Sequence, residues 1–282
     1  SPYFTYQYDN EGNMAGRINK STGEYLKFDY STENRLVSIK TYPSELTPMA
    51  TKEVFYFYDV MGRRIRKDVR DHASPTNVLK TFSRQYVYDG DEILLEFDGN
   101  TNLLARYTHS GLRTDDVLSV DVTNSGVGQK LASAQGSYIF LKDQLGTIQS
   151  VADTAGNIIQ KYSYSAFGIP LGGRDGADND ITNSPIVNFA FSFTGREFDS
   201  ESNLYYLRAR YYDPTIGRFL QLDPEPGRLT APSSMTNKYS YVSNNPINGS
   251  DPTGRSWLSE NTAKIVITLI LVSTAAIVGG AG

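Results

Sequence analysis

The sequence contains no cysteine, and its only histidines are His72 and His109. The absence of cysteine excludes a disulfide framework, a thiolate metal site and a cysteine nucleophile. A histidine-rich zinc site or a Ser-His-Asp triad would have to use one of the two histidines, and neither lies near a nucleophile motif. Both are interpreted as loop or surface residues, and we expect no cofactor and no bound metal.

The chain also lacks a strong charge of either sign. It has 27 basic and 31 acidic residues among 282, a net charge of −4 and no Lys/Arg-rich run. This balance gives no electrostatic footprint for nucleic acid, so no nucleic-acid partner is expected. A hydrophobic fraction of 39% with 21% charged residues is typical of neither a disordered chain nor a multi-span membrane protein.

Tyrosine and glycine are the abundant residues, with 20 and 24 copies. Tyrosine favours half-buried pleated surfaces, and glycine supplies the turns between short strands. The composition therefore predicts an all-β chain with many turns. One acidic, glycine-rich stretch, residues 171–185, is expected to be a solvent-exposed polar loop. It lacks the spaced aspartates of a calcium loop.

Four segments repeat a pattern in which aromatic residues lead into an aspartate. The pattern predicts a hairpin in which the aspartate caps the turn, a residue with positive φ follows, and a second strand returns. Gly12, Asn34 and Gly62 are the expected positive-φ positions. The aspartates, interpreted as turn caps rather than as a carboxylate site, are Asp9, Asp29, Asp59 and Asp89.

The segment 203–214, NLYYLRARYYDP, alternates with a period of two and predicts one strand with two different faces. Arg208 and Arg210 would project to the same side, where they could meet carboxylates or stack on tyrosines. Farther on, Asp223 and Asp251 each precede a proline. On spacing alone these are more simply two turns than an acid pair, although two adjacent aspartates could share a proton and act on a peptide bond.

The ordered series YLRARYYDP, GRF, DP, NNP and DPTG resembles the RHS-repeat-associated core, and the preceding repeats resemble the YD repeats of RHS proteins. The resemblance covers most of residues 1–254. It implies an all-β fold of YD-repeat hairpins forming part of a spiralling β-shell, or cocoon, closed by the core. The expected divisions are hairpins over 1–113, the core over 114–258 and an apolar segment over 259–282.

In many RHS proteins, and in the related C components of bacterial Tc toxins, this core is an aspartic autoprotease that acts once in cis and leaves a C-terminal toxin inside the shell. The resemblance implies Asp223 and Asp251 as the acid pair, with Arg218 as a supporting charge. The implied cut follows Leu258, before Ser259, with Trp257 as an alternative end. Two residues, Pro226 and Arg255, and an insert at 228–235 depart from the family pattern.

The expected function is therefore to enclose and release a C-terminal effector, in a secreted or cell-surface protein of bacterial type. The alternatives are a shell that adheres or binds without cutting, as in animal teneurins, and an inactive scaffold. The expected partners are the chain's own C-terminal passenger and, against the exposed edge strand at 3–8, further YD repeats or a partner subunit. The uncharged run 265–282 could begin the passenger, plug the shell or contact a membrane.

Overall fold

The structure is a computed structural model that describes residues 3–74, 77–111, 114–123, 134–183, 185–225, 237–255 and 258–259. Pro226, the insert at 228–235, Trp257 and the expected passenger segment from residue 260 lie outside these residues. Among the described residues, no helix is long and apolar enough to cross a membrane.

The fold is all-β, as predicted, and is dominated by one antiparallel sheet whose strands follow each other in chain order. The first seven strands are β1 (Phe4–Tyr8), β2 (Met14–Asn19), β3 (Tyr25–Tyr30), β4 (Leu36–Tyr42), β5 (Lys52–Tyr58), β6 (Arg64–Ser74) and β7 (Asn77–Asp89). The next seven are β8 (Glu92–Asp98), β9 (Leu103–His109), β10 (Val117–Val122), β11 (Gly136–Lys142), β12 (Ile148–Ala152), β13 (Ile158–Tyr164) and β14 (Pro170–Asp175). β9 pairs with β10, so one sheet includes strands from both sides of the boundary expected between the hairpin region and the core.

Aspartates build many of the hairpin turns, and of the four predicted caps Asp9 and Asp59 are confirmed, whereas Asp89 ends β7, where it pairs with Glu92 in the ladder. In six turns the aspartate carboxylate accepts the main-chain N–H of the residue four positions later, at 2.7–2.9 Å. These aspartates are Asp9, Asp59, Asp98, Asp143, Asp153 and Asp175. The predicted positive φ is present at Gly12 (82°), Asn34 (58°) and Gly62 (85°). The repeat chemistry therefore extends well beyond the four segments recognised in the sequence.

The prediction for Asp29 was wrong. Asp29 lies within β3 and accepts a hydrogen bond from the Ser38 hydroxyl on the neighbouring strand at 2.7 Å. The turn is made instead by Ser31, whose hydroxyl accepts the main-chain N–H of Glu33 at 3.2 Å. Serine performs here the local side-chain capping that aspartate performs elsewhere.

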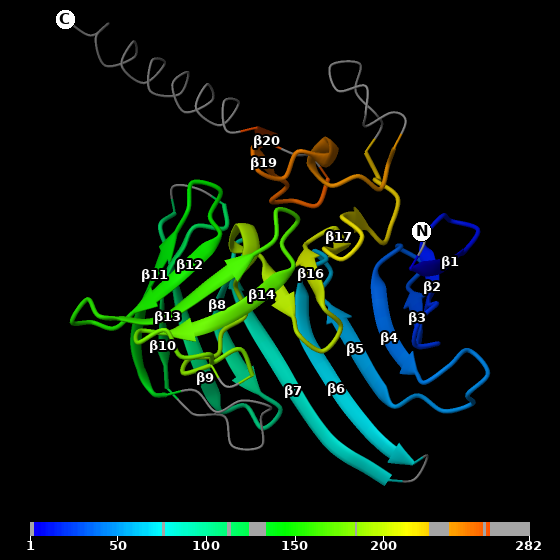
Figure 1. Cartoon of the computed structure of the whole chain (residues 1–282), viewed down its shortest axis with the longest axis horizontal. Helices are drawn as coiled ribbons and strands as arrows, with labels where there is room; N and C mark the ends of the chain where they lie inside the picture. The colour runs from blue at the N-terminus through cyan, green and yellow to red at the C-terminus, as the bar shows by residue number, and fades with distance from the viewer. Residues whose placement is uncertain are drawn as a thin grey trace, which may run out of the picture.

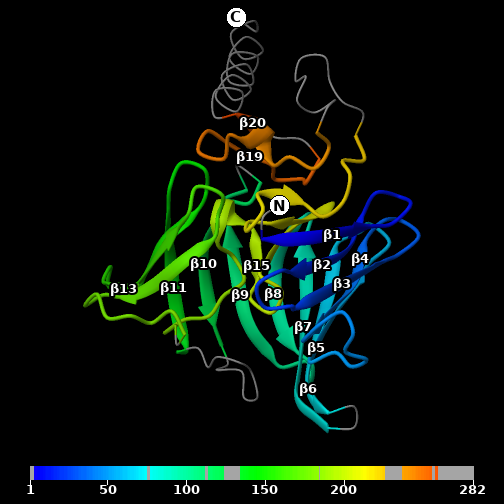
Figure 2. The same ribbon diagram turned by 45° about the vertical axis from the view of Figure 1, so that its right-hand side comes forward.

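A small second sheet packs against the large one. It consists of β15 (Glu197–Asp199), β16 (Leu204–Leu207), β17 (Arg210–Asp213) and β18 (Arg218–Phe219), preceded by the short 3-10 turn η1 (Phe193–Gly195). The large sheet curves so that its first and its last strands lie on opposite sides of the small sheet (Figures 1 and 2). Leu204, Tyr206 and Tyr211 of the small sheet share one buried apolar cluster with the early strands of the large sheet. The small sheet thus packs in the curve of the large sheet (Figures 1 and 2).

Two local predictions were wrong. The segment 203–214 is not one strand but the tight hairpin β16–β17, in which Leu207 pairs with Arg210. Arg208 turns the chain with φ of 54°, at a position that glycine usually fills. The stretch 171–185 is not loop throughout, because Pro170–Asp175 forms the edge strand β14 on β13.

The turn aspartates predict how stability depends on pH. Hydrogen bonds from the Asn157 and Asn179 side chains, followed by main-chain N–H groups, lower the pKa of Asp153 and Asp175. A carboxylate whose pKa is lower in the folded state stabilises the fold above its unfolded pKa, about 3.9, and loses that contribution as the pH falls through the folded value.

We therefore expect the urea midpoint of the protein to fall between pH 5 and pH 3. In the double variant Asp153→Asn/Asp175→Asn the fall should be shallower, because asparagine retains an acceptor oxygen without titrating. An identical fall in the variant and the wild type would show that these turns do not contribute.

Candidate functional site

A loop carrying Asp251 is held against the β16–β17 turn by three consecutive contacts. The Ala209 N–H donates to the Thr253 carbonyl at 3.2 Å. The Arg208 guanidinium donates to the carbonyl of Pro252, and Nε of Arg210 donates to that of Gly254. The loop 251–255 is therefore fixed through its main chain.

Gly254 allows this close approach. Its φ is 67°, and a Cβ built on it would lie 2.1 Å from the Leu207 carbonyl oxygen. No real Cβ contact is so short, and the neighbouring atom belongs to the main chain of a buried strand. Any side chain at this position must therefore push the loop away from the turn.

We expect Gly254→Ala to displace the loop and to lower the free energy of unfolding by roughly 1–3 kcal/mol, the usual cost of a strained backbone position. Chemical denaturation measures the loss. The matched control is Gly156→Ala, which also has positive φ (88°) but has open space around its Cβ. Equal losses in the two variants would show that φ alone, and not the contact with Leu207, sets the cost.

Arg210 joins the two aspartates that the sequence singled out. Its Nη2 lies 3.1 Å from Oδ2 of Asp223 and 3.4 Å from Oδ2 of Asp251. The side chains of Arg210 and Asp251 are 3% exposed, and that of Asp223 is 18% exposed. The structure therefore brings together two carboxylates that are 28 positions apart in the sequence, on a single buried guanidinium.

Arg210 is buried, but its charge has several partners. Burial lowers the pKa of Arg210, and Asp223 and Asp251 act in the opposite direction. Its guanidinium carbon lies 3.6 Å from the centre of the Phe219 ring, and its Nη1 donates to the Lys238 carbonyl at 3.1 Å. These contacts fix the plane of the guanidinium from several sides.

Each aspartate is also held by the main chain next to it. Oδ1 of Asp251 accepts the Arg255 N–H at 3.2 Å, and Oδ1 of Asp223 accepts the Glu225 N–H at 3.0 Å. Both are local turns, as spacing alone predicted. Residue 255 contributes through its main-chain N–H, which any residue except proline supplies, so the departure at Arg255 does not remove this contact.

A supporting charge was expected at Arg218, but the arginine that contacts both Asp223 and Asp251 in the structure is Arg210. Arg218 lies in β18, opposite Asp213 in the ladder, and forms a bridge to Ser240. The signal for Arg210 was present in the sequence, since the alternating RAR segment predicted arginines able to meet carboxylates. What the sequence did not show is which carboxylates they reach.

The expected cleavage site lies next to Asp251 through strand pairing. The two-residue strand β20 (Leu258–Ser259) pairs with β19 (Gly249–Ser250), so that Ser250 is opposite Leu258 and Gly249 is opposite Ser259. Asp251 follows directly on β19. The short 3-10 turn η2 (Val242–Asn244) precedes this unit.

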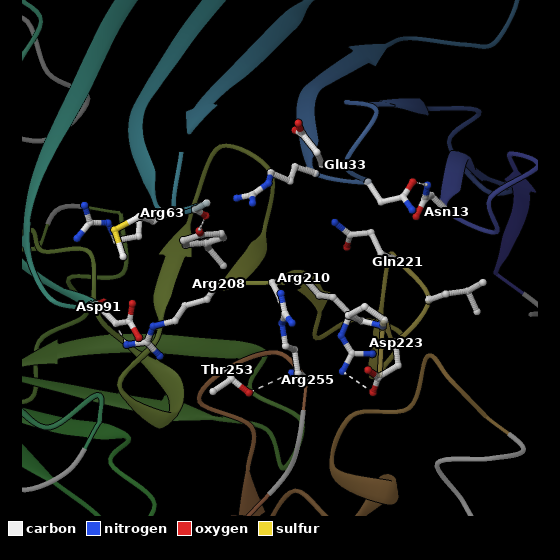
Figure 3. A pocket seen from close by; sticks show the side chains of 18 of the residues that line it. Asn13, Glu33, Arg63, Asp91, Arg208, Arg210, Gln221, Asp223, Thr253 and Arg255 are labelled. Atoms are coloured by element: carbon white, nitrogen blue, oxygen red, sulfur yellow. Dashed lines mark hydrogen bonds and ion pairs between the residues drawn. The ribbon is translucent and has the colours of Figure 1, made fainter. Parts of the chain in front are cut away.

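Arg210 and Asp223 line a cavity of about 540 Å³. Turns of the large sheet reach the same cavity, among them those at Asn13, Glu33 and Arg63 (Figure 3). Three arginines from the later part of the chain also line this cavity, namely Arg208, Arg210 and Arg255. Among the described residues, no group of three or more His, Asp or Glu side chains converges as a metal site requires.

The family model described as Teneurin YD-shell matches residues 126–247. The tRNA nuclease WapA of Bacillus subtilis strain 168 is 32% identical over 257 residues, which are 90% of this chain and 9% of that protein. Toxin protein Tse5 of Pseudomonas aeruginosa is 26% identical over 268 residues, covering 88% of this chain and 18% of Tse5. This chain thus spans less than a fifth of either relative.

Among solved structures, the crystal structure of TcdB2-TccC3-Cdc42 superposes with a TM-score of 0.60 at 19% identity, over 89% of this chain and 13% of that one. At this identity the superposition shows a shared fold. It agrees with the curved meander of hairpins and the packed core described above. Together with the aspartate-capped repeats, these similarities show that the chain belongs to the RHS/YD-shell proteins.

Proposed function

We propose that this chain is the C-terminal part of a shell that encloses its own C-terminal passenger and releases it by cutting the Leu258–Ser259 bond. The observation that carries the proposal is the pairing of β20 with β19, which lies beside Asp251. Arg210, which contacts both Asp251 and Asp223, completes the site. Extended, strand-paired backbone is a common way to present a peptide for recognition.

The chemistry needs only water and the two carboxyl groups. One carboxylate takes a proton from water as the water oxygen bonds to the Leu258 carbonyl carbon, and the other, protonated, gives its proton to the carbonyl oxygen. The resulting diol collapses, the C–N bond breaks and the Ser259 nitrogen takes up a proton. The products are a carboxyl group on Leu258 and an amino group on Ser259.

Arg210 acts in this scheme as a positioning residue. With both aspartates ionised, the three charged groups carry a net charge of −1. The side chains of Arg210 and Asp251 are each 3% exposed, so a charge left there without a partner would be costly. The guanidinium also offsets the repulsion that would otherwise separate two adjacent carboxylates.

The edge of the shell suggests a second partner. In three hairpins a tyrosine lies at the end of the first strand. Its hydroxyl donates to the main-chain carbonyl of the residue that begins the second strand of the preceding hairpin. Tyr30 donates to the Met14 carbonyl at 2.8 Å, Tyr58 to that of Leu36 at 2.6 Å and Tyr88 to that of Arg64 at 2.8 Å. Tyr8 occupies the equivalent position on the edge strand β1 and is 51% exposed. We propose that another hairpin of the same repeat, or a partner subunit, continues the sheet at β1.

The passenger is proposed to be a toxin or other effector. Support comes from Tse5, named as a toxin, and from WapA, named as a tRNA nuclease, which share this segment. A shell that delivers such a passenger acts outside the producing cell, so we propose a secreted or cell-surface location.

The test is a precursor that continues past Gly282, purified and followed on a denaturing gel over time at several protein concentrations. Self-cleavage in cis predicts two fragments that form at a rate independent of concentration. A precursor that stays intact would favour the alternative, a shell used for adhesion or as a scaffold.

A further inference from the structure

The guanidinium of Arg208 connects three separate parts of the chain. Its Nη2 donates to Oε1 of Glu92 at 3.0 Å, to Oδ1 of Asp115 at 2.8 Å and to the carbonyl of Asp91 at 3.2 Å. Its Nη1 donates to Oδ2 of Asp115 at 3.3 Å and to the carbonyl of Pro252. One side chain thus contacts the β7–β8 turn, the loop before β10 and the residue next to Asp251.

The carboxylates that hold Arg208 are themselves fixed. Oε1 of Glu92 accepts the Asp115 N–H at 3.0 Å. Asp115 is buried, has φ of 64° and forms an ion pair with Arg196. Arg196 in turn donates to the Tyr206 carbonyl at 2.9 Å. A non-glycine residue in this backbone region persists only where its surroundings hold it in place, as this set of contacts does.

The same contacts that bind Arg208 to Glu92 and Asp115 also fix the direction in which it reaches the Asp251 loop. Burial acts against its charge, yet Asp115 and Glu92 raise the pKa of Arg208, so the guanidinium stays protonated. The fork geometry of arginine lets one group bond to Glu92, Asp115 and Pro252 at once. Without the two carboxylates, only the contact with the Asp91 carbonyl would remain to orient the guanidinium toward the Pro252 carbonyl.

We infer that Arg208 is a positioning residue that makes the Asp251 loop depend on the folded large sheet. Glu92 belongs to β8, and Asp115 lies two residues before the start of β10. The acid pair would then assemble only after these strands have formed, so that the cut follows the folding of this part of the large sheet. This inference rests on the proposed self-cleavage.

The first test uses the purified precursor and a double-mutant cycle on the rate of self-cleavage. Glu92→Gln and Arg208→Lys should each slow cleavage about 10- to 100-fold. The double variant should be no more than about threefold slower than the slower single variant, because both changes break the same connection. Multiplying effects in the double variant would show that the two residues act independently and would overturn the inference.

The matched control is Glu96→Gln. Glu96 lies on the same strand, is buried and ion-paired to Arg84 at 2.5 Å, and accepts from the Tyr107 hydroxyl at 2.8 Å. Its replacement should lower thermal stability at least as much as Glu92→Gln while leaving the cleavage rate within about twofold of wild type. If Glu96→Gln slows cleavage as much as Glu92→Gln, general destabilisation explains the effect and the inference fails.

A second measurement decides the matter even if the precursor does not cut itself. Hydrogen exchange is followed at the amides of Gly254 and Arg255, which bond to Asp251. In the Asp223→Asn background, where the chain stays intact, Glu92→Gln should speed exchange at these amides at least tenfold and Glu96→Gln should not. Unchanged exchange in Glu92→Gln would overturn the coupling, whereas an uncut wild type with the predicted exchange would overturn the proposed cleavage alone.

Discussion

Replacing Asp251 by asparagine is expected to stop self-cleavage of the precursor, with a fall in rate of at least about 10²–10⁴-fold, the contribution typical of a general acid or base. Asparagine keeps the size of the side chain and an acceptor for the Arg255 N–H. It cannot take up or release the proton that the carboxyl group transfers during the reaction. Asp223→Asn should have an effect of the same size, because the scheme uses both carboxyl groups. Densitometry of precursor and fragments over time measures both rates.

The control for this prediction is Glu33→Gln, which removes a carboxylate from the same cavity without touching Arg210 or either aspartate. It should leave the rate within about twofold of wild type. Cleavage that continues at the wild-type rate in Asp251→Asn would rule out the aspartyl scheme, whatever enzyme then makes the cut.

Replacing Arg64 by methionine is expected to cost about 3–5 kcal/mol of folding free energy, the usual effect of removing one partner of a buried ion pair. The Arg64 side chain is 1% exposed and lies 2.6 Å from Oε2 of Glu197, and it also contacts Asp199. Its guanidinium carbon lies 4.7 Å from the centre of the Tyr206 ring. These contacts join β6 of the large sheet to the small sheet. The variant removes the ion pair of the buried Glu197, whereas Asp199 keeps its ion pair with Lys67 at 2.8 Å.

The matched control is Arg66→Met on the same strand. Arg66 is 48% exposed and pairs with Asp68, so its loss should cost about 0–1 kcal/mol. Chemical denaturation of both variants gives the comparison, and failure of Arg64→Met to fold agrees with the prediction. If Arg64→Met lowers the free energy of unfolding by less than about 1 kcal/mol, the contacts of Arg64 with Glu197 and Asp199 do not hold the two sheets together.

Local chemistry made much of the fold predictable. Aspartates followed by glycine or asparagine fix turns over four or five residues, so Asp9 and Asp59 could be placed from the sequence. The hairpin at 204–213 was missed because its turn residue, Arg208, has a positive φ without being glycine or asparagine. Its alternating side chains continue through the turn, and a period of two does not distinguish one long strand from two short ones.

The site was harder to predict because its contacts are long-range. Arg208 reaches Asp115 across 93 positions, and Arg64 reaches Asp199 across 135. No local pattern specifies such pairs, since they depend on how the small sheet packs in the curve of the large one. The choice between Arg210 and Arg218 shows the same limit. Arg218 is nearer to Asp223 in the sequence, but Arg210 is the residue that contacts both aspartates.

The most direct test of the account is the intact mass of the shell fragment produced by the purified precursor. The account predicts a fragment that ends at Leu258 and a passenger that begins at Ser259, with neither product formed by Asp223→Asn. A single uncut mass in the wild type, or fragments that also form in Asp223→Asn, would contradict it.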